Sequence, residues 1–129
     1  MKKLIAILVS SLFVLTACGT AGASVTTMNV PDFAKKITDK SVVLLDVRTP
    51  LEFATGHIAG ATNIDFESGT FASDIQKLDM TKTYAVYCRS GNRSGQATAI
   101  MAKDGFKSIF NLNGGIINWQ SAGNTLVNN

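Results

Sequence analysis

Residues 84–105 read YAVYCRSGNRSGQATAIMAKDG, in which an apolar run, a polar loop and a helix-like segment follow one another. The run Tyr84-Ala85-Val86-Tyr87 is short, continuous and largely apolar, as expected of a strand buried on both faces. Apolar residues then recur at helical spacing from Ser94 to Lys103, and Gly105 suits the end of a helix. The polar loop that starts at Cys88 therefore joins the carboxyl end of a strand to the amino end of a helix.

Strand and helix signals alternate from Val25 onward. Val42-Val43-Leu44-Leu45 predicts a second strand buried on both faces. The remaining predicted elements are a helix over 32–38 preceded by Pro31, a strand over 62–64, a helix over 71–78, a strand over 108–112 and a helix over 115–119. This alternation predicts a single α/β domain with a mostly parallel central sheet and helices on both faces. In such sheets, ligands bind at the carboxyl ends of the strands.

Several features of the loop favour the thiolate form of Cys88. Backbone N–H groups of a tight loop converge on its centre, the following helix presents the positive end of its dipole, and Arg89 and Arg93 add charge. Gly91 has the conformational freedom that lets several amides point inward. A buried, inert core cysteine is the alternative. Because polar loop residues follow at once, we favour a reactive nucleophile with a lowered pKa.

The first residues predict a secretory signal peptide over 1–17. Lys2 and Lys3 form a basic start, and 4–17 is an uncharged stretch of mostly apolar residues. This stretch is shorter than the roughly 20 apolar residues that a membrane-spanning helix needs. We therefore expect the folded domain to begin after it.

The segment Leu15-Thr16-Ala17-Cys18 resembles the bacterial lipobox. That resemblance implies an acylated Cys18 at the mature amino terminus, a flexible tether over 18–27 and a domain over 28–129. The protein would then be an extracytoplasmic lipoprotein on the periplasmic or cell-surface side of its membrane. Cleavage after Ala23 is the alternative, and it would release a soluble periplasmic protein. In either case Cys88 has no second cysteine with which to form a disulfide.

Charge argues against nucleic acid as a partner. The chain has twelve Lys and Arg and nine Asp and Glu, but Lys2 and Lys3 leave with the signal, so ten basic residues face nine acidic ones. Binding to phosphates requires clustered cations, and no basic run survives processing.

The loop 88–94 closely resembles the active-site loop of rhodanese domains, and other landmarks of that family occur in order along the chain. They are Asp46-Val47-Arg48, Glu52-Phe53, Gly56-His57-Ile58, Gly60-Ala61, Asn63-Ile64 and Leu112-Asn113-Gly114-Gly115 followed by Trp119. Together they span nearly the whole mature chain. The chain is thus identified as a single rhodanese-like domain, where some relatives join two.

That resemblance implies a sulfurtransferase. Cys88 would attack the outer sulfur of a donor such as thiosulfate, sulfite would leave, and the persulfide would pass its sulfur to cyanide or a thiol. The anion-binding loop would comprise Arg89, Ser90, Gly91, Asn92, Arg93 and Ser94. Its amides and Arg93, to which Arg89 can add a second charge, would stabilise the donor and the departing sulfite. No metal or organic cofactor is required, and we expect a monomer.

Two other functions stay open. Dual-specificity phosphatases of the rhodanese-like fold also use a loop cysteine and arginine, but four residues separate Cys88 from Arg93, as in sulfurtransferases, and those phosphatases carry one more. A noncatalytic module could also display a persulfide or hold an oxyanion for a partner. The presence of Cys88 favours a domain that at least accepts sulfur.

The other polar landmarks are interpreted as supporting residues. We expect Asp46 to accept N–H bonds of its own loop and Arg48 to pair with a carboxylate such as Glu52. His57 is expected to bond the backbone through its ring and not to act as a general base. Gly114 and Gly115 are expected to permit a turn.

Overall fold

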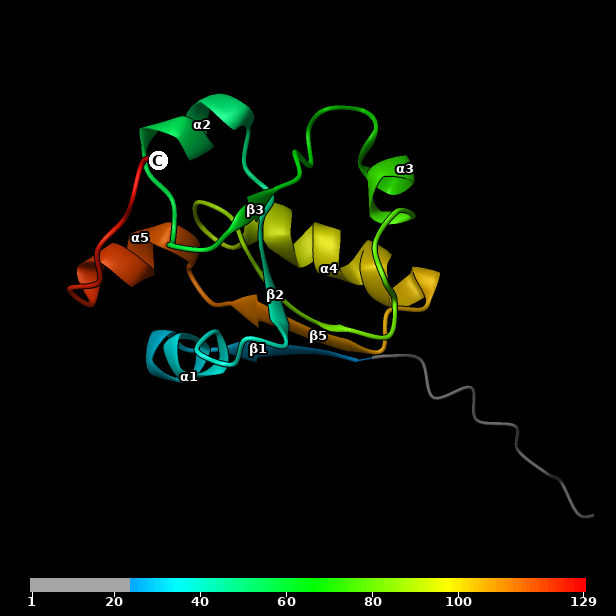
Figure 1. Ribbon diagram of the computed structural model, residues 1–129, viewed down its shortest axis with the longest axis horizontal. Helices are drawn as coiled ribbons and strands as arrows, with labels where there is room; N and C mark the ends of the chain where they lie inside the picture. Colours follow the sequence, from blue (N-terminus) through cyan, green and yellow to red (C-terminus); the bar gives the residue numbers. More distant parts are fainter. Residues whose placement is uncertain (1–23) are drawn as a thin grey trace, which may run out of the picture.

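A computed structural model describes residues 24–129, so the predicted signal peptide and Cys18 lie outside the described residues. Its core is a five-stranded sheet in the order β1-β5-β4-β2-β3 (Figure 1). The strands are β1 (Val25–Met28), β2 (Val42–Asp46), β3 (Thr62–Asn63), β4 (Thr83–Tyr87) and β5 (Ser108–Leu112). All four pairs of neighbouring strands are parallel. The predicted α/β fold class is confirmed.

Helices cover both faces of the sheet. They are α1 (Val30–Lys36), α2 (Pro50–Thr55), α3 (Phe71–Ile75), α4 (Asn92–Asp104) and α5 (Gly115–Ser121). One buried cluster joins the sheet to α3 and α4 through residues such as Ile75 and Met101. A second cluster joins the other face to α1 and α5 through Phe33 and Trp119. The sheet is therefore the middle layer of three.

The central strand β4 has the character that its sequence predicts. Tyr84 and Val86 belong to the cluster under α3 and α4, whereas Ala85 and Tyr87 belong to the cluster under α1 and α5. Successive side chains of a strand point to opposite faces, so a strand between two helical layers needs a continuous apolar run. Cys88 follows directly, at the carboxyl end of this strand.

The predicted tether extends too far. Val25–Met28 forms β1, which pairs with β5 from Val25 opposite Ile109 to Met28 opposite Leu112. Valine and threonine favour extended backbone, and Val25 and Met28 are half-buried on the sheet. The folded domain therefore begins at least three residues before the predicted boundary at 28.

Helix α2 was not predicted from the sequence. It has only six residues, too few for a helical period to appear, but it begins with a capping box. The Thr49 side chain accepts from the Glu52 amide, the Glu52 side chain accepts from the Thr49 amide, and Pro50 fills the first helical position. These start signals, present in Thr49-Pro50-Leu51-Glu52, could have revealed the helix.

Other element boundaries shift by a few residues. Helix α1 starts at Val30 and not at 32, because the Asn29 side chain caps it by accepting from the Asp32 amide at 3.0 Å. Helix α4 starts at Asn92, directly after Gly91 in the left-handed region at φ +100°. Helix α3 ends at Ile75, three residues short of the prediction. Gly105 ends α4 at φ +107°, as predicted.

The carboxyl edge of the sheet carries the elements around the loop. Helix α2 follows β2, the Cys88 loop follows β4, and α5 follows β5. Figure 1 shows α2, α5 and the C-terminal segment gathered at one end of the sheet. His57 and Val127 pair through their backbones with two 2.8 Å hydrogen bonds, which fastens the C-terminal segment beside α2. Within residues 24–129, no helix is long and apolar enough to cross a membrane.

Candidate active site

The Cys88 thiol lies inside the loop that links β4 to α4. The residue is 1% exposed, and its Sγ accepts a hydrogen bond from the Gly91 amide at 3.1 Å. Gly91 lies in the left-handed region at φ +100° and turns the chain from the loop into α4, which begins at the next residue. The loop thus wraps a single sulfur atom with backbone donors.

The loop lowers the pKa of Cys88 below that of an ordinary thiol. Burial by itself raises this pKa, because it disfavours the charged form. The nearby Ser94 hydroxyl and the amides of Ser94, Gly91 and Ser90, of which the Gly91 amide donates to Sγ at 3.1 Å, lower it and outweigh the burial. The thiolate is the nucleophilic form, so the loop activates the sulfur even though the sulfur is buried.

Arg93 does not face the loop as a free cation. Its Nη2 lies 3.0 Å from Glu52 Oε2, its Nη1 lies 3.6 Å from Glu67 Oε2, and its side chain is 17% exposed. The guanidinium therefore ties the start of α4 to α2 and to the segment after β3. An anion bound in the loop would have to share this charge with two carboxylates.

Arg48 pairs with a carboxylate, as predicted, but the partner is Asp46 and not Glu52. Arg48 donates to the Asp46 carboxylate from Nε at 3.0 Å and from Nη2 at 2.7 Å. Asp46 also accepts from the Arg48 amide at 2.9 Å, as predicted for an acid that supports its own loop. Because Asp46 and Arg48 form a bidentate pair with each other, Glu52 is available to Arg93.

The Asp46–Arg48 pair is buried and fixes the neighbouring chain. Asp46 is 0% and Arg48 is 5% exposed. The Arg48 Nη2 also donates to the Gly56 carbonyl at 2.7 Å, at the end of α2. Removing either residue would leave the other as an uncompensated buried charge. Because Arg48 also donates to the end of α2, the pair holds α2 beside the loop.

His57 is held by the protein backbone, as predicted. It is 4% exposed, its Nδ1 lies 2.9 Å from the Phe53 carbonyl oxygen, and its ring stacks on Phe53 with centroids 3.7 Å apart. These contacts give the ring the backbone-bonding role that the sequence predicts.

The remaining loop residues lie at the surface. Ser90 and Asn92 are exposed, and the Asn92 side chain accepts from Gln96 Nε2 at 2.7 Å. Arg89 is also exposed, and within residues 24–129 no carboxylate lies within ion-pairing distance of it. Arg89 is therefore the loop cation that is available to an incoming anion.

The start of α5 contacts the backbone of the loop and holds it in place. The sequence does not predict this contact. The amides of Ile116 and Ile117 donate to the carbonyls of Cys88 and Arg89 at 2.9 and 3.2 Å. Gly115, at φ +59°, packs so closely that a Cβ there would lie 2.5 Å from the Cys88 carbonyl oxygen. The two glycines at 114 and 115 thus bring α5 against the active loop, beyond the turn expected of them.

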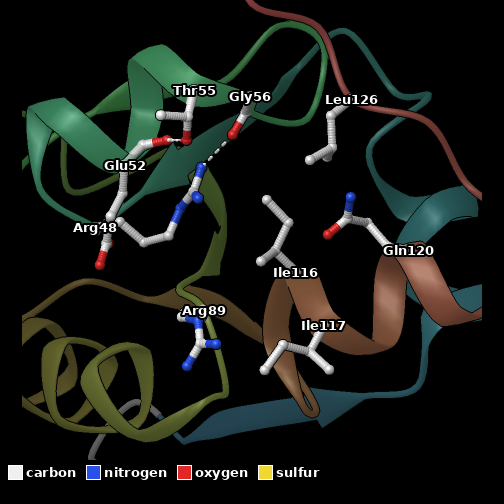
Figure 2. A pocket seen from close by; sticks show the side chains of 9 residues that line it. All are labelled: Arg48, Glu52, Thr55, Gly56, Arg89, Ile116, Ile117, Gln120 and Leu126. Atoms are coloured by element: carbon white, nitrogen blue, oxygen red, sulfur yellow. Dashed lines mark hydrogen bonds between the residues drawn. The ribbon is translucent and has the colours of Figure 1, made fainter.

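A cavity of about 360 Å³ adjoins the loop (Figure 2). Side chains from α2, the Cys88 loop, α5 and the C-terminal segment line it, and they include Arg48, Glu52, Arg89, Ile116, Ile117, Gln120 and Leu126. Cys88 itself does not line it. Within residues 24–129, the cavity included, no group of three His, Cys, Asp or Glu side chains has the arrangement of a metal site.

Known proteins are similar in sequence to this domain. A model of the Rhodanese-like domain family matches residues 29–122. Thiosulfate sulfurtransferase GlpE of Pseudomonas aeruginosa (strain LESB58) is 34% identical over 91 residues, which are 70% of this chain and 81% of that protein. The tRNA uridine(34) hydroxylase of Pelagibacter ubique (strain HTCC1062) is 36% identical over 86 residues, which are 66% of this chain but only 29% of that protein.

Solved structures share its fold. A rhodanese-related protein from Thermoplasma volcanium has a TM-score of 0.72 at 32% identity, covering 81% of this chain and 99% of that chain. A protein from Staphylococcus saprophyticus has a TM-score of 0.67 at 28% identity, covering 79% of this chain and 98% of that chain. Because the family model spans most of the chain and the fold agrees, the chain belongs to the rhodanese-like domain family.

Proposed function

We propose that this protein is a sulfurtransferase that carries sulfur as a persulfide on Cys88, taking it from thiosulfate or a similar donor. The observation that carries the proposal is the Cys88 sulfur, which accepts from the Gly91 amide inside a loop that lowers its pKa. Similarity to thiosulfate sulfurtransferases supports the choice of donor. Similarity to a hydroxylase over a small part of that protein indicates that the domain also occurs in other settings.

The reaction has two displacement steps. The Cys88 thiolate attacks the outer sulfur of thiosulfate, the sulfur–sulfur bond of the donor breaks, and sulfite leaves with the bonding electron pair. The acceptor, cyanide or a thiolate, then attacks the outer sulfur of the persulfide and restores the Cys88 thiolate. The loop amides that favour the thiolate also stabilise the anionic groups that form and leave.

Mass spectrometry of the purified protein tests this proposal. Exposure to thiosulfate should add about 32 Da, the mass of one sulfur atom in a covalent intermediate, and cyanide should then remove it. An adduct that cyanide removes but that passes to no thiol would indicate a persulfide carrier. Hydrolysis of a phosphate monoester without any adduct would indicate the phosphatase alternative and contradict the proposal.

The similarity to thiosulfate sulfurtransferases leads to a prediction for Arg93, whose charge a bound anion would share with Glu52 and Glu67. Arg93→Ala should lower kcat/KM for thiosulfate by roughly 10- to 100-fold, the loss expected for one hydrogen bond to a charged group. An uncharged sulfur donor should lose less, because it presents no anion to the guanidinium. Lys103→Ala is a matched control, since it removes a charge from the exposed far end of α4. Equal losses with both donors would contradict an anion-binding role for Arg93.

We also propose that the mature protein is exported and anchored to a membrane through lipid on Cys18. The basic start, the apolar stretch over 4–17 and the cysteine after Ala17 support this proposal. Cys18→Ser should shift the protein from the membrane fraction to the soluble fraction, with sulfur transfer unchanged in vitro. Membrane association that survives the substitution would contradict lipid anchoring, and the intact mass of the wild-type protein would identify the cleavage site.

A further inference from the structure

The cavity beside the loop shares residues with the contacts that hold the loop in place. Ile116 and Ile117, which line it, donate their amides to the carbonyls of Cys88 and Arg89. Glu52, on the opposite wall, pairs with Arg93 at the other end of the loop. A molecule in the cavity would therefore lie next to the loop that holds the reactive sulfur.

The cavity is larger than a sulfur oxyanion requires. Thiosulfate is a compact anion, whereas about 360 Å³ falls at the lower end of the range of small-molecule sites, roughly 300–1,000 Å³. Figure 2 shows Ile116, Gln120 and Leu126 pointing toward its middle from α5 and the C-terminal segment. This space suits an organic molecule and not only the donor.

One unmatched charge marks one end of the cavity. The Arg48 guanidinium pairs with Asp46, and the Glu52 carboxylate pairs with Arg93, which Glu67 also contacts. Arg89 has no carboxylate partner within residues 24–129. A ligand that complements this cavity thus carries a negative group, and a carboxylate matches the planar guanidinium in two hydrogen bonds.

The walls next to Arg89 are apolar. Ile117 is one of the few large apolar side chains with substantial exposure, at 42%, and Figure 2 shows it at the same end of the cavity as Arg89. Ile116 and Leu126 add further apolar surface. A ligand would bury this surface together with its own hydrocarbon part.

From this arrangement we propose that the cavity binds the sulfur acceptor, a small organic thiol that carries a carboxylate on a short hydrocarbon chain. The carboxylate pairs with Arg89, and the chain packs on Ile117 and Leu126. The inference rests on the proposed sulfurtransferase function. The acceptor thiolate attacks the outer sulfur of the Cys88 persulfide, Cys88 leaves as a thiolate, and the acceptor becomes the persulfide.

The first test compares two acceptors on protein whose Cys88 has been loaded with thiosulfate. We expect the KM for 3-mercaptopropionate to be roughly tenfold lower than that for 2-mercaptoethanol, at equal concentrations of thiolate, because only the former pairs with Arg89. Equal KM values would overturn the proposal. Loading is measured separately, so a failure to form the persulfide would count against the proposed function and not against the acceptor site.

Variants then locate the site. Ile117→Glu places a carboxylate beside Arg89, and the KM for 3-mercaptopropionate should rise roughly tenfold, with a smaller rise for 2-mercaptoethanol. Gln120→Glu adds a negative charge to the cavity without removing an apolar side chain. It should likewise raise the KM for 3-mercaptopropionate more than the KM for 2-mercaptoethanol. Leu51→Glu is the matched control, because Leu51 is 78% exposed on α2 and does not line the cavity. Equal effects of Ile117→Glu and Leu51→Glu would overturn the assignment of this cavity.

Discussion

Cys88→Ser should abolish persulfide formation and lower sulfur transfer roughly a thousandfold or more, because the attacking atom is lost. A serine hydroxyl fits the same buried position and can accept the same hydrogen bond from the Gly91 amide. It ionises far less readily than a thiol and attacks sulfur poorly. Thiosulfate should therefore leave the mass of the variant unchanged, and the thermal unfolding midpoint should stay close to that of the wild type.

The pH dependence of the wild-type thiol provides the companion measurement. The pKa of Cys88 is lowered, so its thiolate is present above this lowered pKa and is lost only as the pH falls through it. The rate of alkylation should accordingly reach half its maximum below about 8.5, the pKa of a free cysteine. Sulfur transfer that persists in the serine variant, or a midpoint at or above that value, would remove Cys88 from its proposed role.

The features of the fold that the sequence predicted are local ones. The apolar runs at 42–45 and 84–87 identify two of the three inner strands, β2 and β4, because a strand buried on both faces has no polar alternation. The loop between 84–87 and the helix that follows was predicted in the same way. The sequence does not predict helix α2, because it is only six residues long. It does not predict strand β1 either, because this segment resembles a polar tether.

The features that the sequence could not predict join residues that are distant along the chain. Glu52 and Arg93 are 41 positions apart, and nothing near either residue identifies its partner. A carboxylate near Arg48 was expected, but the choice between Asp46 and Glu52 depended on backbone geometry at the end of β2. The cavity likewise combines α2, α5 and the C-terminal segment, whose proximity follows from the sheet order.

Gly115 is the position where a single added methyl group should do the most damage to this loop. A Cβ there would lie 2.5 Å from the Cys88 carbonyl oxygen and 2.6 Å from the Arg89 carbonyl carbon and oxygen. These are backbone atoms, which cannot rotate away as a flexible side chain can. Relief of the clash would require α5 to withdraw and would break the bonds from Ile116 and Ile117 that hold the loop.

Gly115→Ala should accordingly lower the free energy of unfolding by about 2–5 kcal/mol, which combines the cost of a left-handed alanine with that of overpacking. Gly123→Ala is the matched control, because Gly123 has a similar conformation at φ +88° but no atom within 4 Å of an added Cβ. The control should lose only about 1–2 kcal/mol in urea denaturation and should form the persulfide normally. Equal losses in the two variants would mean that backbone strain explains the whole effect and that α5 does not brace the Cys88 loop.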